Sequence, residues 1–147
     1  MADFTWSYSA LKQYENCPRQ YNEIRVLKNY VVKENEAMRY GTEVHKALED
    51  YVAEGKPLAK NYQRFKSMVD PLVDIPGIKY PEHEMALTYD KLPCDFGSEH
   101  RWVRGIADLL IVDGDYAFIV DYKTGSNKYP DPKQLRLMAL MVFTHFP

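Results

Sequence analysis

A pair of strand-like segments in the C-terminal half of the chain constrains its fold more than any other feature. Residues 102–112 and 116–123 are rich in aliphatic and aromatic residues, and the Asp-Gly-Asp sequence between them is typical of a tight hairpin turn. Both faces of this hairpin are apolar at alternating positions: Leu110, Val112, Ala117 and Ile119 on one face, and Leu109, Ile111, Phe118 and Val120 on the other. A sheet that is apolar on both faces has to be covered on both, so the sequence predicts an α/β fold with a mixed central sheet flanked by helices.

Apolar periodicity and capping residues predict the remaining elements. Residues 37–54 form the clearest predicted helix, because they carry one apolar stripe and are followed by Gly55. The stripe consists of Val44, Leu48, Tyr51 and Val52. The other predicted elements are a short helix capped by Ser9, a helix from Pro18 toward Val26, a helix over residues 61–73, a strand over residues 82–88 and a last helix opened by Asp131-Pro132.

Length and composition limit the class of protein. The 147 residues predict one domain over residues 1–147, and 46% hydrophobic with 27% charged residues exclude an intrinsically disordered or collagen-like chain. The sequence shows no signal peptide and no apolar run near the roughly 18 residues of a membrane span, so we expect a cytoplasmic protein without membrane contact. We expect Cys17 and Cys94 to be reduced thiols. Because the chain stops directly after an apolar helix, we also expect a further strand in a longer form, of which this chain is a C-terminal truncation.

Two acids and a lysine are placed on one face of the predicted hairpin. If residues 114–115 are the loop, Asp108 faces Asp121. If residues 113–114 are the loop, Asp108 faces Ile119 instead. In both registers Asp108, Asp121 and Lys123 share a face, because strand side chains alternate with period two. A loop of three residues would break this inference.

Neighbouring carboxylates on an apolar hairpin require a compensating cation. They repel each other and are costly to desolvate. Lys123 supplies one positive charge, and a hard divalent ion such as Mg²⁺ or Mn²⁺ would supply more. The alternative interpretation is a surface hairpin whose charges are solvated. The net charge of −2 argues mildly against a protein that binds nucleic acid by charge alone.

Several motifs resemble those of one nuclease superfamily. Gly105-Ile106-Ala107-Asp108, followed by Asp121-Tyr122-Lys123-Thr124-Gly125, resembles the superfamily named for its PD-(D/E)xK signature, and more narrowly its RecB-type branch, which includes CRISPR-associated and phage exonucleases. Further elements of that branch are similar in type and order: Ser9, Leu11, Tyr14, Cys17-Pro18 and Tyr21, then Gly41-Thr42, His45 and Leu48-Glu49, then Glu84, and finally Gln134-Leu135.

The resemblance implies a fold, an activity and a set of site residues. It implies a restriction-endonuclease-like core and a deoxyribonuclease dependent on Mg²⁺ or Mn²⁺, an exonuclease of recombination, repair or phage DNA processing. Its metal ligands would be His45, Asp108, Asp121 and the backbone carbonyl of Tyr122. Lys123 would orient or activate the attacking water, and Gln134 would contact a phosphate or a water. DNA is the implied partner, together with a second copy of the chain or a recombination protein.

Residues around these motifs could assist DNA binding, although ordinary packing and solvated charge explain each of them as well. The basic candidates are Arg101, Arg104, Lys128, Lys133 and Arg136, and the candidates for stacking on unpaired bases are Trp102, Tyr122 and Tyr129.

The sequence also departs from the pattern of the branch. Met138 stands where its helix has a tyrosine, which puts the grip on DNA in doubt. Without a C-terminal cysteine trio, Cys17 is expected to be a buried helix residue rather than a cluster ligand. These departures leave open a second function, a weak or inactive nuclease-fold module that binds DNA or a protein partner.

Overall fold

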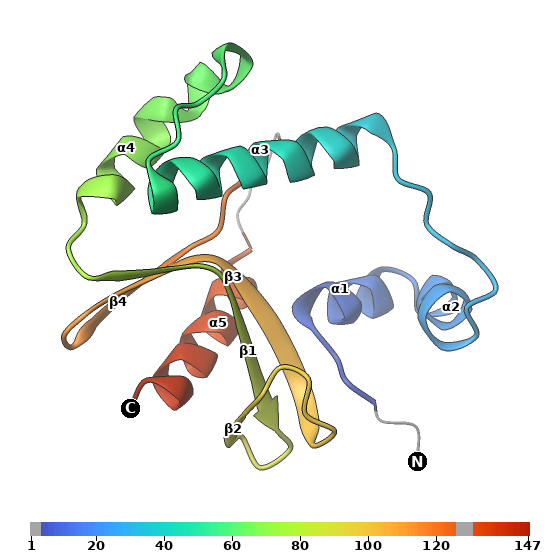
Figure 1. Ribbon diagram of the computed structural model, residues 1–147. Coiled ribbons are helices and arrows are strands. Elements are labelled where there is room, and N and C mark those ends of the chain that lie inside the picture. The colour runs from blue at the N-terminus through green and yellow to red at the C-terminus, as the bar shows by residue number, and fades with distance from the viewer. Residues whose placement is uncertain (1–3, 126–130) are drawn as a thin grey trace. The chain divides into compact units, whose positions relative to one another are not determined.

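The computed structural model describes residues 4–125 and 131–147 of the chain (Figure 1). Its elements in order are α1 (Tyr8–Asn16), α2 (Pro18–Tyr21), the π-helical turn η1 (Asn22–Val26), α3 (Glu36–Glu54), the 3-10 helix η2 (Lys60–Phe65), α4 (Lys66–Asp74), β1 (Ile78–Thr88), β2 (Pro93–Cys94), β3 (Arg101–Asp113), β4 (Tyr116–Val120) and α5 (Pro132–His145). The strands form a sheet in the order β2-β1-β3-β4, with β1–β2 and β3–β4 antiparallel. The predicted α/β class is confirmed.

The chain forms two compact units, and three elements run from one into the other. Unit 1 consists of the N-terminal segment up to Glu34, Glu84–Gly105 and Arg136–Pro147. Unit 2 consists of Asn35–His83 and Ile106–Leu135. That residues 1–147 make up one nuclease domain stays a prediction. Among the helices of the described ranges, none combines the length and apolarity that crossing a membrane requires.

The core of unit 2 lies between α3 and the hairpin strands. Val44, Leu48 and Val52 form the buried stripe of α3, as the periodicity predicts. They pack with Leu58 and Val69 and with residues of the hairpin, namely Leu109, Ile111 and Tyr122. Figure 1 shows α4 beside the C-terminal part of α3, at whose end Gly55 adopts a left-handed φ of +70°. The long helix is therefore stabilised by burial as well as by its caps.

The register of the hairpin decides between the alternatives left open by the sequence. Asp113 pairs with Tyr116, so Gly114 and Asp115 form the two-residue loop. The ladder ends at Leu109 and Val120, three residues short of the predicted strand end. The prediction that both faces of the sheet are covered does not hold along all of β4. Its residues Tyr116 and Phe118 are 72% and 42% exposed.

Several predicted boundaries are wrong. β1 starts four residues before the predicted strand, and β2 lies in a segment for which no helix or strand was predicted. The first turn of the predicted helix over residues 61–73 is a 3-10 helix. Short or polar segments of this kind carry too few alternating positions to produce a clear period.

The beginning of unit 1 differs from the prediction at two caps. Ser7, not Ser9, caps α1, because its hydroxyl accepts a hydrogen bond from the amide of Ala10 at 3.3 Å. Cys17 is exposed rather than buried, and its sulfur caps α2 by accepting from the amide of Gln20 at 3.4 Å. Cys17 and Cys94 are both free thiols, as expected.

Met138 lies in the core of unit 1. It is 6% exposed, and a Cβ placed on Gly105 would approach its Cε to 2.7 Å. Met141 and Val142 of the same helix are buried too. Position 138 therefore fills space against β3, where a flexible thioether adapts easily to an irregular gap.

A network of polar side chains connects α4 to α3. The hydroxyl of Tyr51 donates to the carboxylate of Asp70, which also binds the ammonium of Lys66 at 2.7 Å. Lys66 first, and Tyr51 second, lower the pKa of Asp70. A folded-state pKa below the unfolded one adds stability above the unfolded pKa, and this stability is lost as the pH falls through the folded pKa. Asp70→Asn is therefore expected to be less stable than the parent at neutral pH.

Urea unfolding at a series of pH values measures this effect. The difference between Asp70→Asn and the parent should shrink as the pH falls below the ordinary range of an aspartate. Asp74→Asn, which changes an exposed acid at the end of the same helix, is the control. A difference for Asp70→Asn that stays constant down to acid pH would contradict the ionic role of Asp70.

Candidate active site

Three segments of unit 2 bring three of the six predicted site residues together. His45 comes from α3, Asp108 from β3, and Tyr122 from the segment after β4. Nδ1 of His45 lies 3.6 Å from Oδ2 of Asp108, and that oxygen accepts a hydrogen bond from the backbone amide of Tyr122 at 2.7 Å. The Asp108 carboxylate thus takes the place of a backbone carbonyl, which explains why the ladder ends before Asp121.

Lys123 joins the second acid to the start of α5. Its ammonium lies 2.5 Å from Oδ2 of Asp121 and donates to Oε1 of Gln134 at 3.3 Å. Gln134 lies in the first turn of α5, which Asp131 opens by accepting from the amide of Lys133 at 3.0 Å. A cavity of about 300 Å³ adjoins these groups and is lined by Ile119, Val120, Asp121, Lys123, Asp131, Gln134 and Leu135. Charged, polar and apolar side chains thus line this cavity together.

The electrostatic field at His45 is negative. The side chain of Asp108 raises the pKa of His45 most, burial opposes this rise, and the backbone of Tyr122 and the charge of Asp121 add to it. The imidazole lies edge-on to the ring of Tyr122, with 5.9 Å between ring centroids. The protonated imidazole is favoured because positive charge is stabilised at this position.

Tyr122 is buried beneath the site. Only 4% of it is exposed, so its ring cannot stack on a base as the sequence suggested. Burial, followed by the charges of Asp108, Glu49 and Glu82, raises the pKa of Tyr122 to about 12. Its hydroxyl has no hydrogen-bond partner among the described residues.

Two acids near Asp108 were missed by the sequence analysis as site residues. Glu49 follows His45 by four positions on α3, a spacing that puts both on one helix face, and Lys46 binds it at 3.3 Å. Partial desolvation first, and then the charges of Asp108 and Glu49, raise the pKa of Glu82. Glu82 has a φ of +46°, a left-handed backbone that is uncommon outside glycine. Glu84, the acid that the resemblance indicated, is exposed on β1 and belongs to unit 1.

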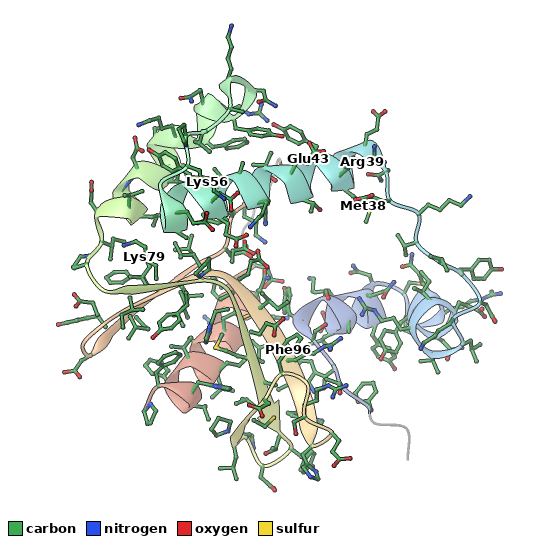
Figure 2. The ribbon with its side chains drawn as sticks, viewed as in Figure 1. Met38, Arg39, Glu43, Lys56, Lys79 and Phe96 are labelled. Atoms are coloured by element: carbon green, nitrogen blue, oxygen red, sulfur yellow. The ribbon has the colours of Figure 1, made fainter. Side chains whose placement is uncertain are left out.

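Two of the basic residues predicted to contact DNA have roles in local packing. A guanidinium nitrogen of Arg101 donates to the carbonyls of Gly97 and Ser98. The Arg104 guanidinium lies 5.1 Å from the ring centroid of Phe96, which Figure 2 labels.

The remaining contact candidates differ in how far the structure describes them. The ring of Trp102 packs edge-on against Trp6. Lys133 and Arg136 are exposed, and Lys128 and Tyr129 lie outside the described residues.

The donor chemistry fits a hard divalent cation, although the site is not preassembled. An imidazole nitrogen, two aspartates and a backbone carbonyl are donors that Mg²⁺ and Mn²⁺ accept. The raised pKa of His45 reflects negative charge that such a cation would offset, whereas the pKa of Glu82 is raised first by burial and only then by neighbouring charge. Within residues 4–125 and 131–147, however, no three His, Cys, Asp or Glu side chains converge closely enough to hold a metal ion. Asp121 is bound by Lys123 instead.

Comparison with known proteins gives one similarity. The model of the PD-(D/E)XK nuclease superfamily matches residues 5–76, just under half of the chain. No curated protein and no solved structure matches it. The matched part contains His45 and ends before Asp108 and Asp121, so it supports a nuclease independently of the acidic hairpin. The chain is thus similar to this superfamily over residues 5–76, and its α/β architecture is consistent with the superfamily's fold.

Proposed function

We propose that this protein is a metal-dependent nuclease that hydrolyses phosphodiester bonds of DNA. The observation that carries the proposal is the grouping of His45 with Asp108, and of Asp121 with Lys123, in a unit that begins within the nuclease-like part of the chain. An imidazole, two carboxylates and an ammonium in this combination suit phosphoryl chemistry, because they can hold both a metal ion and an anionic substrate.

The residues of the site divide the work between them. His45, Asp108, Asp121 and the carbonyl of Tyr122 would hold the cation. When bound, a divalent ion lowers the pKa of a water and offsets charge on phosphate oxygens. The amide of Tyr122 fixes the Asp108 carboxylate at 2.7 Å. The positions of these oxygens therefore depend on the backbone that follows β4.

Lys123 is the group we assign to the water and the phosphate. An ammonium has three N–H donors, and two of them are used by Asp121 and Gln134. The third remains for a water or a phosphate oxygen. Gln134 keeps the ammonium near Asp121, so it acts as a positioning residue.

We further propose that the enzyme is an exonuclease of DNA recombination, repair or phage DNA processing. The cavity of about 300 Å³ beside Lys123, lined by both charged and apolar side chains, has a size that suits one nucleotide near a strand end better than a long duplex tract. A second copy of the chain or a recombination protein could complete the DNA channel.

Incubation with linear and covalently closed circular DNA tests this function. We expect the linear DNA to be degraded in Mg²⁺ or Mn²⁺ and to be preserved when excess EDTA is present. The circular DNA should persist, because it has no ends. Degradation that EDTA does not reduce would contradict metal dependence, and equal loss of circular DNA would contradict the exonuclease assignment while leaving the nuclease intact.

The bond between Lys123 and Asp121 favours one alternative, a module that binds DNA or a protein without cutting. An acid held by an internal cation at 2.5 Å is less available to a metal ion. Calorimetric titration with Mn²⁺ separates the two functions. A nuclease should take up the ion with measurable heat, and a binding module need not do so.

A further inference from the structure

We propose that a pocket in unit 1 binds one unpaired base of a DNA strand, an inference that rests on the proposed function. The pocket has a volume of about 370 Å³ and is called the aromatic pocket below. It is lined by Phe4, Trp6, Ala10, Leu11, Tyr14 and Tyr21. All of these residues belong to the N-terminal segment of unit 1, in or next to α1 and α2.

Two of the four aromatic side chains of this pocket are largely exposed. Phe4 is 60% and Tyr14 is 53% exposed, although both line a concave surface. Exposed apolar groups in a concavity indicate a binding site, because solvent contact there is costly. The ring of Tyr14 stands edge-on to that of Tyr21, with 5.5 Å between centroids and an angle of 89° between planes. An edge-on pair leaves ring faces available to a further flat ring.

The size and lining of the pocket favour a nucleobase. Its volume is near the lower end of small-ligand sites, about 300–1,000 Å³, which suits one base with part of its sugar rather than a base pair. Successive bases of single strands stack on aromatic side chains, and this contact tolerates any base because each has a flat π-face. DNA, the proposed substrate, exposes unpaired bases wherever its two strands separate.

Charge complementarity distinguishes DNA from an apolar peptide as the occupant. The residues that line the pocket are uncharged, so no carboxylate among them would repel a phosphate and the charge that matters lies on the surrounding segment. Residues 4–34 carry five basic and three acidic side chains, whereas the whole chain has a net charge of −2. The guanidinium of Arg25 is held by the side chain of Gln13, the neighbour of Tyr14, at 2.5 Å. The net positive charge of this segment would favour the phosphates that flank a bound base.

Intrinsic fluorescence offers a direct test, because the chain has only two tryptophans and both report on this pocket. Trp6 lines it, and Trp102 lies 5.2 Å from Trp6 between ring centroids. The probe is an oligothymidylate of about ten nucleotides, titrated in EDTA so that no cleavage occurs. The control probe is an abasic oligonucleotide of equal length and charge. We expect the oligothymidylate to quench the fluorescence and to bind about tenfold more tightly than the abasic probe.

Variants of the pocket test where the base binds. Tyr14→Ala should weaken oligothymidylate binding about tenfold, and Tyr14→Phe should restore it, because the ring is retained. Tyr116→Ala, which removes an exposed tyrosine at the hairpin of unit 2, is the matched control. Equal affinity for both probes, or unchanged binding by Tyr14→Ala, would overturn the proposal. If the natural occupant is an apolar peptide, the protein should bind the oligothymidylate and the abasic probe with equal affinity.

The cleavage assay keeps this inference separate from the proposed function. Base-dependent quenching by a protein that cuts no DNA would support the aromatic pocket and contradict the nuclease. Metal-dependent cleavage without base-dependent quenching would support the nuclease and overturn the pocket.

Discussion

Replacing Asp121 with asparagine is expected to lower the rate of DNA hydrolysis at least about 100-fold, the loss typical of removing one group that stabilises transition-state charge. Asparagine keeps the size of the side chain but removes the charge that binds Lys123 at 2.5 Å and that would hold the cation. The ammonium then loses its ionic partner beside Gln134, so both the metal and the attacking water are affected. Single-turnover cleavage of linear DNA in Mn²⁺ measures the effect on chemistry apart from product release.

A neighbouring acid provides the control for Asp121→Asn. Asp113 pairs with Tyr116 at the turn of the same hairpin, and its side chain is exposed. Asp113→Asn removes one negative charge from the same hairpin but at an exposed position, so we expect its cleavage rate to stay within about twofold of the parent. If Asp121→Asn cleaves as fast as Asp113→Asn, Asp121 has no part in the reaction. Calorimetry with Mn²⁺ on both variants then shows whether Asp121 contributes to metal binding.

The candidate site could be predicted from the sequence as far as simple periodicity applies. Period-two alternation put Asp108 and Asp121 on one face in either of the two registers left open, and the observed pairing of Asp113 with Tyr116 is the register in which the two acids would be opposite. Alternation could not show that Glu82 rather than Glu84 lies near the site, because residues two apart in a strand are on the same face. The left-handed φ of Glu82 interrupts the regular alternation, and no residue type in the sequence signals it.

The fold was predictable where several local preferences agree. In α3, the Asn35 side chain caps the first turn at 2.8 Å from the amide of Met38, an apolar stripe follows, and Gly55 ends the helix. Cys17 shows the opposite case. It was expected to be a buried helix residue because no C-terminal cysteine trio follows that would make it a cluster ligand. A position directly before Pro18 is an N-cap, however, where the sulfur accepts a backbone hydrogen bond. Local capping therefore accounts for the exposed position of the thiol.

No local pattern in the chain indicates why methionine stands at position 138. The absence of the branch's tyrosine suggested a loss of DNA contact, but the side chain is buried against Gly105 rather than facing solvent. The two positions depend on each other, because β3 approaches α5 closely only without a Cβ at 105. Such a pairing joins residues 33 positions apart, and local patterns cannot reveal it.

Replacing Gly77 with alanine is expected to destabilise the protein by about 2–5 kcal/mol, a combination of backbone strain and overpacking. Gly77 has a φ of +113°, and a Cβ there would lie 2.4 Å from the carbonyl oxygen of Val112 and 2.9 Å from Cβ of Asp113. The clash is with backbone that is held in the β3–β4 ladder, so no side-chain rotation relieves it.

Gly55→Ala is the matched control for Gly77→Ala. Gly55 also has a positive φ, +70°, but a Cβ there has no neighbour within 4 Å, so the expected loss is only about 1 kcal/mol. Urea unfolding of both variants measures the difference. Equal losses would mean that only the backbone conformation matters and that β3 yields to the added methyl group. A much larger loss for Gly77→Ala would show that the segment between α4 and β1 is packed tightly against the strand that carries Asp108.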